Sequence, residues 1–346
     1  MPVSQTDKEA IEELPSLKEW GKAWNKSTKR EVAFDPGSKV LVPVGIRLGI
    51  PNVDSMLGDG FPKGRSVVFV GEPGTGKTLL SQLVIAAAQR EGGRAMFFDA
   101  EKTYDPRWFE LTGVDTSPEK LIIVRPRNLE QAFDMIEDAL ERIKPAVIVV
   151  DSVPALVPKK ITEERMEDKD NIALAPRKIG TAIQKATLAN TVTCLIFINQ
   201  IRTAIGKWGD PSDMPGGWAF KHANSQLIRT RRGAWILENE DKSEMVLGDD
   251  REKKKVGFIL KLRVERNKVS EPWKEAEVEF RWKDGSVDWT ASLVHEAMIK
   301  GVIGSPTKGY FISNLWEGKI HGREKLENTI RADADLKAKT IERIKQ

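Results

Sequence analysis

The stretch Gly71-Glu72-Pro73-Gly74-Thr75-Gly76-Lys77-Thr78 decides the fold class of this 346-residue chain. It fits the pattern G-x-x-x-x-G-K-[ST] in full and stands between an apolar run and a helical segment. Glycines let backbone N–H groups converge on phosphate oxygens, and the following helix adds its positive end. Lys77 is expected to neutralise the β- and γ-phosphates, Thr78 to place its hydroxyl on Mg²⁺, and Leu79 to complete the nucleotide-binding set.

Around this loop, short apolar runs alternate with helical segments. Runs that predict strands lie at residues 66–70, 95–99, 121–124, 146–151 and 194–199, and helical stretches at 77–90, 129–143 and 172–189. Unbroken apolar runs are typical of a parallel sheet covered on both faces, so an α/β domain is expected. Strand-like runs at 226–231, 256–264 and 276–282 have no helices between them and predict an antiparallel continuation.

The chain is expected to comprise three parts. Residues 1–40 form an N-terminal helix and strand (the strand at 31–34), too small to bury an apolar face and therefore expected to dock on another surface. Residues 41–291 form the core. Residues 292–346 form a small C-terminal α/β domain with helices at 293–299 and 323–344.

Composition bounds the class of protein. Lys and Arg number 55 and Asp and Glu 51, and a net charge of +4 is too small to prove a polyanionic partner. The single Cys194 excludes an internal disulfide and favours a reducing compartment. No apolar run approaches the roughly 20 residues that span a bilayer, and the N-terminus carries no secretory signal. These features predict a cytoplasmic protein with no membrane partner.

Two carboxylates follow neighbouring predicted strands. Asp151 ends the run 146–150, where this class holds its metal, although a helix N-cap is the alternative. Glu101 follows the strand 95–99 and is expected at the same sheet edge, near the γ-phosphate, with a solvated loop charge as the alternative.

An ordered set of motifs resembles the bacterial and phage RecA-type recombinases across most of the chain. The set comprises residues 46–65 leading into the phosphate loop, DAEKTYDP at 99–106, VVDSVPAL at 149–156, FINQIR at 197–202 with Gly216-Gly217, and Arg266-Asn267-Lys268 with Pro272-Trp273. A phosphate loop alone indicates a superfamily, whereas this ordered set is far more specific. The resemblance implies a RecA-like P-loop ATPase core with a mostly parallel central sheet flanked by helices, an N-terminal oligomerisation segment and a small C-terminal α/β domain.

The resemblance also implies residue roles. Glu101 activates water, Asp151 supports the Mg²⁺ shell, and Gln200 senses the γ-phosphate. Arg266 and Lys268 reach the γ-phosphate of the neighbouring subunit. Three further residues are expected at the nucleobase, namely Asp105 and Trp108, with Trp289 stacking on it.

The chain departs from the family pattern at three places. His222 stands where an aromatic residue commonly transmits the ATP signal, and Leu227 where a basic residue often sits. Residues 295–346 form no acidic tail, which predicts less self-restraint on duplex binding. These departures and the chain length favour a phage-encoded member.

Two polar stretches predict DNA-binding loops, at about residues 158–176 and 202–218. Both follow strands that end in nucleotide-site residues, so the ATP and DNA sites would share connected segments. Glycines and prolines in the second stretch resist regular structure. Expected DNA contacts are Arg177, Arg202, Thr203, Lys207, Trp208, Gly216, Gly217 and Trp218. The tryptophans could stack on bases or pack within the protein, and the arginines could be solvated or ion-paired instead.

The resemblance implies an ATP- and Mg²⁺-dependent recombinase that assembles head to tail as a helical homo-oligomer on single-stranded DNA and pairs it with double-stranded DNA. DNA-dependent ATP hydrolysis follows, with single-strand-binding and loader proteins as further expected partners. Two alternatives stay open at this point: a hexameric helicase-like or clock-type ATPase, and an ATP-gated DNA-binding scaffold or mediator with little turnover.

Overall fold

The computed structural model describes residues 17–28, 45–58, 60–163, 174–203, 212–213, 224–238, 245–248 and 253–345. The chain divides into two units, residues 1–42 and 43–346. In the first unit the described part is helix α2 (Leu17–Thr28), which carries the half-exposed Trp20. The strand predicted at residues 31–34 lies outside the described residues.

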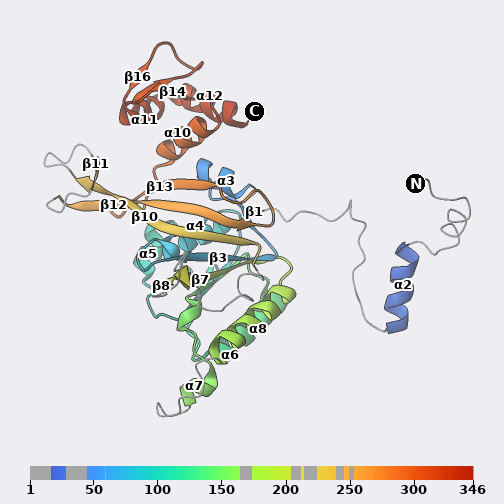
Figure 1. Cartoon of the computed structure of the whole chain (residues 1–346). Helices are drawn as coiled ribbons and strands as arrows, with labels where there is room; N and C mark the ends of the chain where they lie inside the picture. Colours follow the sequence, from blue (N-terminus) through green and yellow to red (C-terminus); the bar gives the residue numbers. More distant parts are fainter. Residues whose placement is uncertain are drawn as a thin grey trace, which may run out of the picture. The chain divides into compact units, whose positions relative to one another are not determined.

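A nine-stranded sheet forms the centre of the second unit (Figure 1). Eight strands follow one another in the order β13 (Glu275–Arg281), β12 (Lys255–Asn267), β10 (Gln226–Glu238), β3 (Arg65–Gly71), β7 (Cys194–Gln200), β6 (Val147–Asp151), β4 (Ala95–Asp99) and β5 (Leu121–Val124). The ninth, β11 (Met245–Gly248), pairs with β10. Strands β10 through β5 are parallel, whereas β12 and β13 are antiparallel. This order confirms the predicted change from parallel to antiparallel pairing.

Helices cover both faces of the sheet. Side chains alternate along each strand, so one strand contributes to the apolar clusters on both faces. Val67 and Phe69 of β3 join the cluster beneath α4 (Lys77–Arg90). Val68 and Val70 join the opposite cluster, beneath α6 (Leu129–Asp138) and α8 (Leu174–Ala189). The fully buried strands explain why their sequences are unbroken apolar runs.

Two predicted helices differ from the structure. The helix predicted at 129–143 ends as an α-helix at Asp138 and continues as a π-helical turn, η2 (Ala139–Ile143), which the Lys144 N–H closes on the Ala139 carbonyl before Pro145. The helix predicted at 323–344 is two helices, α11 (Arg323–Ala332) and α12 (Ala334–Lys345). Asp333 between them is extended and its carboxylate accepts from the N–H groups of Asp335 and Leu336, which caps α12.

The C-terminal residues enclose an apolar cluster of their own. Helix α10 (Trp289–Ile299) supplies Leu293, α11 supplies Leu326, and Phe311 comes from β15 (Tyr310–Ile312), which pairs with β14 (Gly304–Thr307) and β16 (Ile320–His321). Helix α10 also packs on α3 (Pro51–Leu57).

The remaining elements are short. They are β1 (Gly45–Ile46) paired with β2 (Phe61–Pro62), α5 (Pro106–Leu111), η3 (Val153–Ala155), α7 (Lys159–Glu163), and β8 (Arg202–Thr203) paired with β9 (Ser212–Asp213). Among the helices described, none has the length and apolar character needed to cross a membrane.

Candidate nucleotide-binding site

The phosphate loop connects β3 to α4, as the motif predicts. Gly74 and Gly76 have φ values of 70° and 85°, a left-handed conformation that glycine adopts at little cost. A Cβ on Gly71 would approach the Thr230 carbonyl oxygen to 2.5 Å. The loop is further fixed by Thr75, whose hydroxyl donates to the Glu72 carbonyl at 2.7 Å.

Lys77 opens α4 and is buried beneath the loop. Its Nζ donates to the carbonyl oxygens of Gly71 at 3.0 Å and Glu72 at 2.7 Å. Burial lowers the pKa of this ammonium, while the nearby carboxylates of Asp151, Glu101 and Glu72 act in the opposite direction. The side chain thus places an ammonium group beneath the phosphate loop.

Thr78 and Asp151 meet at the end of β6. The Thr78 hydroxyl donates to Asp151 Oδ2 at 2.6 Å. Burial is the main reason that the pKa of Asp151 is raised to about 6; the carboxylates of Glu101 and Asp99 add to this shift, and the Thr78 hydrogen bond and Lys77 oppose it. The residue that precedes η3 is Ser152, so Asp151 is not its N-cap, and that alternative is wrong.

Glu101 lies beside the same strand ends. Its Oε1 accepts hydrogen bonds from the Ser152 hydroxyl and from Gln200 Nε2, the latter at 3.0 Å. Its backbone N–H donates to the Asp151 carbonyl oxygen at 3.2 Å. Glu101 is exposed to solvent, but these hydrogen bonds hold its carboxylate at the sheet edge. Gln200 ends β7, so the ends of β4, β6 and β7 bring one carboxylate, one hydroxyl and one amide together.

A cleft of about 440 Å³ opens above these groups. One side comprises Pro73 to Leu79 of the loop and helix, with Glu101, Asp151, Gln200 and the half-exposed Trp108. The other side was absent from the predictions. It comes from β10, β12, β13 and the turn after β13, and comprises Arg232, Trp235, Phe258, Phe280 and Trp282. The Arg232 guanidinium lies 4.4 Å from the Trp235 ring centroid.

The three residues predicted to contact the nucleobase do not lie at one site. Trp108 lines the cleft. Asp105 precedes it as the N-cap of α5, where its carboxylate accepts from Arg107, and those hydrogen bonds lower the pKa of Asp105. Trp289 does not line the cleft. Its Nε1 donates to the Gly49 carbonyl at 2.6 Å, and its ring packs against the C-terminal cluster with the Lys337 ammonium 4.4 Å away.

Arg266 and Lys268 lie at the other end of the sheet. Arg266 pairs with Leu227, which pairs with Val68 of β3. The Lys268 N–H donates to the Ser225 carbonyl, and the Ser225 N–H to the Ser66 carbonyl. Five residues of β3, roughly 16 Å, separate Ser66 from Gly71 at the phosphate loop. These two cations are therefore remote from the phosphate loop of their own chain.

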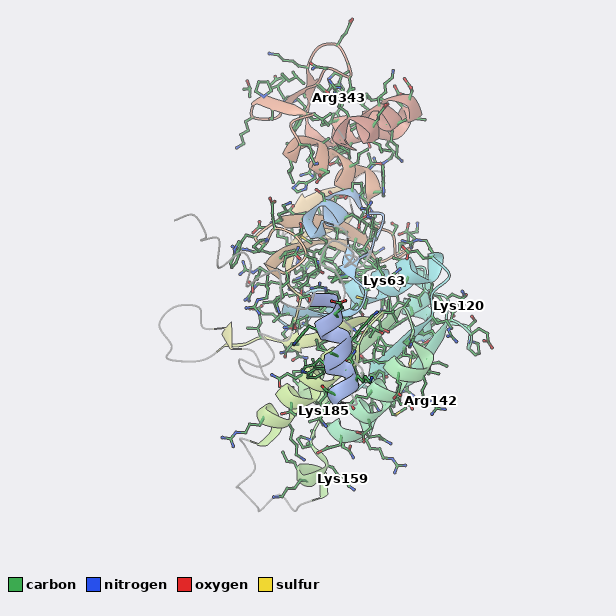
Figure 2. All side chains as sticks on the ribbon, turned by 90° about the vertical axis from the view of Figure 1, so that its right-hand side faces the viewer. Lys63, Lys120, Arg142, Lys159, Lys185 and Arg343 are labelled. Atoms are coloured by element: carbon green, nitrogen blue, oxygen red, sulfur yellow. The ribbon has the colours of Figure 1, made fainter. Side chains whose placement is uncertain are left out.

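The predicted DNA loops are described only in part. Arg177 is exposed on α8 beside Lys178, whose ammonium lies 2.6 Å from Glu130. Lys159 of α7 and Lys185 of α8 occupy the lower part of the view in Figure 2. Arg202 and Thr203 form the backbone of β8. Predictions that lie outside the described residues concern Lys207, Trp208, Gly216, Gly217, Trp218 and His222.

Three features define a P-loop ATPase site on an α/β sheet. They are a phosphate loop between a parallel strand and a helix, a hydroxyl–carboxylate pair, and a carboxylate held by two hydrogen-bond donors. In the part of the chain that is described, no group of three His, Cys, Asp or Glu residues forms a separate metal centre.

Comparison with known proteins identifies the branch of this class. The model of the RecA N-terminal domain matches residues 39–287. Protein RecA of Thermus thermophilus is 33% identical over 352 residues, which cover 99% of this chain and 97% of the relative. Protein RecA of Thermus aquaticus is 33% identical over 95% of this chain and 93% of its own length, and that of Francisella philomiragia is 34% identical over 84% and 78%.

The chain belongs to the RecA family. It is a RecA-type recombinase, and ATP-dependent strand exchange and DNA-dependent ATP hydrolysis are the activities of that family. The family binds ATP with Mg²⁺ and forms filaments on DNA. Family membership favours this function over the hexameric-ring and scaffold alternatives.

Proposed function

We propose that this chain promotes homologous pairing and strand exchange as a helical filament on single-stranded DNA, with one nucleotide held at each junction between subunits. The observation that carries the proposal is the division of the charged groups. One cleft brings together Lys77, Thr78, Asp151, Glu101 and Gln200. Arg266 is level with Val68 of β3, roughly 10 Å of strand from Gly71, and Lys268 is level with Ser66, roughly 16 Å from it. This separation favours two different subunits as the source of the two sets.

In the cleft, the N–H groups of residues 71–78 and the positive end of α4 would hold the phosphates. Lys77 would exchange the carbonyl oxygens of Gly71 and Glu72 for phosphate oxygens. The Thr78 hydroxyl and Asp151 carboxylate, 2.6 Å apart, are the hard oxygen donors that Mg²⁺ prefers. When bound, Mg²⁺ supplies charge neutralisation between the β- and γ-phosphates.

Glu101 is the proposed general base. Its Oε1 already accepts two hydrogen bonds, which orient the carboxylate and leave Oε2 to accept a proton from water. Because one of those donors is Gln200, movement of the β7 end would change the orientation of the base. The segment after Gln200 leads into the predicted second DNA loop, so DNA contact there would alter hydrolysis through this hydrogen bond.

Arg266 and Lys268 are proposed to act on the nucleotide of the adjoining subunit. An interface that joins one end of the sheet to the opposite end of the next copy is head to tail, and such interfaces generate helices when rotation does not close a ring. Burial and the charges of Arg266 and Arg65 lower the pKa of Lys268, so three cations share this end of the sheet. An anionic partner would relieve their repulsion.

The finer assignments are proposals on the same footing. Arg177, Arg202 and Thr203 would hold the DNA backbone together with residues 207–208 and 216–218. Asp105 and Trp108 would contact the nucleobase. Residues 1–40 would dock on the adjoining core, and residues 292–346 would form a separate domain. Single-strand-binding proteins, loader proteins, the bacterial cytoplasm and a phage origin stay predictions.

A strand-exchange assay with a homologous duplex, with and without ATP, tests the activity. The proposal is supported if the wild type exchanges strands only when ATP is present and Lys77→Ala does not exchange them. Failure of a DNA-loaded, ATP-bound filament to exchange strands would overturn it. Glu101→Gln is expected to lower ATPase activity by about 10²–10⁴-fold while DNA binding survives.

Mixing two inactive variants tests the assignment across the junction. Lys77→Ala removes the phosphate-binding ammonium of the cleft, and Lys268→Ala removes a cation proposed to act across the junction. If the two act at one junction, a mixture contains some junctions with an intact cleft and an intact Lys268, and ATPase activity returns. A mixture no more active than its two components, although it co-assembles, would contradict the assignment.

A further inference from the structure

The wall of the cleft that β10 forms carries a cation, Arg232. Its side chain is exposed and lines the cleft. A Cβ on Gly74 would lie 3.8 Å from Arg232 Nη1, so the guanidinium lies beside the middle of the phosphate loop. Within the described lining, the cleft thus has a second cation besides Lys77.

The face of β10 that carries Arg232 rests on the phosphate loop. Thr230 and Arg232 are two residues apart and therefore lie on one face of the strand. The Thr230 hydroxyl is 2.8 Å from the Thr75 hydroxyl, with which it shares a hydrogen bond. Arg232 pairs with Leu260 of β12, and a Cβ on Gly76 would lie 3.0 Å from Leu260 Cδ1. The loop and this face of the sheet are therefore in direct contact, and that contact places Arg232 at the cleft.

A β-bulge brings an aromatic ring to the same face. Arg232 pairs with Leu260 and Trp235 with Phe258, so three steps along β10 match two steps along β12. The additional residue returns Trp235 to the face of Arg232, as bulges beside active sites commonly do. The guanidinium lies 4.4 Å from the Trp235 ring centroid, and this ring packs on Phe258 with 6.5 Å between centroids. Trp235 thereby limits the positions that the Arg232 side chain can take.

Positive charge accumulates at this wall. The Lys255 ammonium lies 4.5 Å from the same Trp235 centroid. The described residues include no carboxylate that forms an ion pair with Arg232 or with Lys255. Two cations near one ring repel each other, and an anion between or beside them lowers that energy. The planar guanidinium, with its fork of N–H donors, matches the oxygens of a phosphate group.

We propose that Arg232 donates hydrogen bonds to the phosphates of the nucleotide held by the phosphate loop of its own chain, and that Trp235 positions it for this role. The proposal rests on the proposed function, because it takes the cleft to be the nucleotide site. Arg266 and Lys268 would act from the adjoining subunit, whereas Arg232 belongs to the cleft before any assembly. The triphosphate would therefore meet cations from both chains.

Two partial ligands test the phosphate contact, namely inorganic tripolyphosphate, which lacks the base, and adenosine, which lacks the phosphates. Arg232→Ala is expected to raise the KM for ATP about tenfold, which corresponds to about 1.4 kcal/mol. It should weaken competitive inhibition by tripolyphosphate by a similar factor and leave inhibition by adenosine unchanged. Arg232→Lys should fall between Arg232→Ala and the wild type, because it keeps the charge and loses the fork of donors.

Arg231→Ala is the matched control. It removes the same charge from the next residue of β10, whose side chain alternates to the opposite face and does not line the cleft. The proposal is overturned if Arg232→Ala changes the KM and the inhibition by tripolyphosphate no more than Arg231→Ala does. Equal weakening of inhibition by tripolyphosphate and by adenosine would also overturn it, since that result indicates general damage to the cleft.

The positioning role of Trp235 is tested by a double-mutant cycle. Trp235→Leu should raise the KM for ATP less than Arg232→Ala does, and Trp235→Phe should restore most of the affinity, since phenylalanine keeps an aromatic face. If Trp235 acts through Arg232, adding Trp235→Leu to Arg232→Ala should raise the KM no further. Fully additive effects of the two substitutions would overturn the positioning role.

Mixtures of variants decide which subunit's nucleotide Arg232 serves. At an ATP concentration near the wild-type KM, a mixture of Arg232→Ala and Lys268→Ala should exceed the mean activity of its components, because some junctions combine an intact cleft with an intact Lys268. A mixture of Arg232→Ala and Lys77→Ala should not, because every cleft carries a defect. If Lys77→Ala with Lys268→Ala recovers activity, the proposed function stands. If Arg232→Ala then recovers with Lys77→Ala and not with Lys268→Ala, its assignment to its own chain's nucleotide is overturned.

Discussion

Gln200 Nε2 donates to Glu101 Oε1 across 3.0 Å, although Gln200 ends β7 and Glu101 follows β4, two strands that are not neighbours in the sheet. β6 lies between β4 and β7, and Ser152, the residue after β6, donates to the same oxygen. The carboxylate proposed to activate water is therefore oriented by two donors that come from the ends of two different strands. Ser152 leads into the short helix η3, whereas Gln200 leads toward the predicted second DNA loop.

This difference predicts different effects for the two donors. Gln200→Ala should abolish most of the DNA stimulation of ATPase activity, at least tenfold, and leave nucleotide binding intact. Ser152→Ala should lower the rate with and without DNA by a similar factor, because it removes orientation without removing the link to DNA. Steady-state ATPase assays with and without single-stranded DNA measure both. Equal loss of stimulation in the two variants would contradict a coupling role for Gln200.

Asp151 is expected to destabilise the nucleotide-free protein near neutral pH. Its pKa is about 6 in the folded state, against about 3.9 for an unperturbed Asp. The folded state therefore holds a proton that the unfolded state releases between these values. The stability contributed by the protonated form is present below about pH 4 and is lost as pH rises to 6, at a cost of about 3 kcal/mol.

Asp151→Asn should accordingly raise the melting temperature of the nucleotide-free protein at pH 7.5, with a gain that shrinks toward pH 5. The variant should lose most of the additional stabilisation that ATP and Mg²⁺ give the wild type. Calorimetry from pH 5 to 8 measures both effects. Asp288 is the control. Burial raises its pKa, but the Ala291 N–H and the guanidinium groups of Arg331 and Arg281 outweigh burial, so Asp288→Asn should destabilise at pH 7.5. A gain in both variants would refute this account.

The sequence predicts the first half of the site well because its residues follow buried parallel strands. The runs at 95–99 and 121–124 and the helix at 77–90 have the observed bounds. The carboxyl ends of parallel strands meet at one sheet edge, so Glu101 and Asp151 could be brought together without any knowledge of side-chain contacts.

The opposite wall of the cleft could not be derived in this way. β10 and β12 pair with shifts of register, one of them between Arg232 and Trp235. Each shift moves the following side chains to the other face, so alternation along the sequence does not reveal which of them face the cleft. Trp282 and Trp289 lie seven residues apart, and only the tertiary structure separates the cleft residue from the residue of the C-terminal cluster.

Gly71 should tolerate no side chain. A Cβ there would lie 2.5 Å from the Thr230 carbonyl oxygen and 2.7 Å from the Thr75 hydroxyl, and the first of these is backbone that cannot rotate away. Gly71→Ala is expected to cost about 1–3 kcal/mol of unfolding free energy and to weaken ATP binding. Gly304→Ala is the control, because its nearest neighbour, Ile312, lies at 3.4 Å. Chemical denaturation measures the difference, and equal stability of the two variants would contradict the packing argument.

The resemblance and the structure predict different roles for Trp289. The resemblance expects it to stack on the nucleobase, whereas its Nε1 binds the Gly49 carbonyl and its ring packs with the C-terminal cluster. Trp289→Phe should therefore remove about 1 kcal/mol of stability and lower the melting temperature by about 2–4 °C, with no change in the KM for ATP. Trp108→Ala, in the cleft lining, should raise that KM without lowering the melting temperature. A KM that rises as much in Trp289→Phe as in Trp108→Ala would restore the stacking role of Trp289 and require the C-terminal residues to move when nucleotide binds.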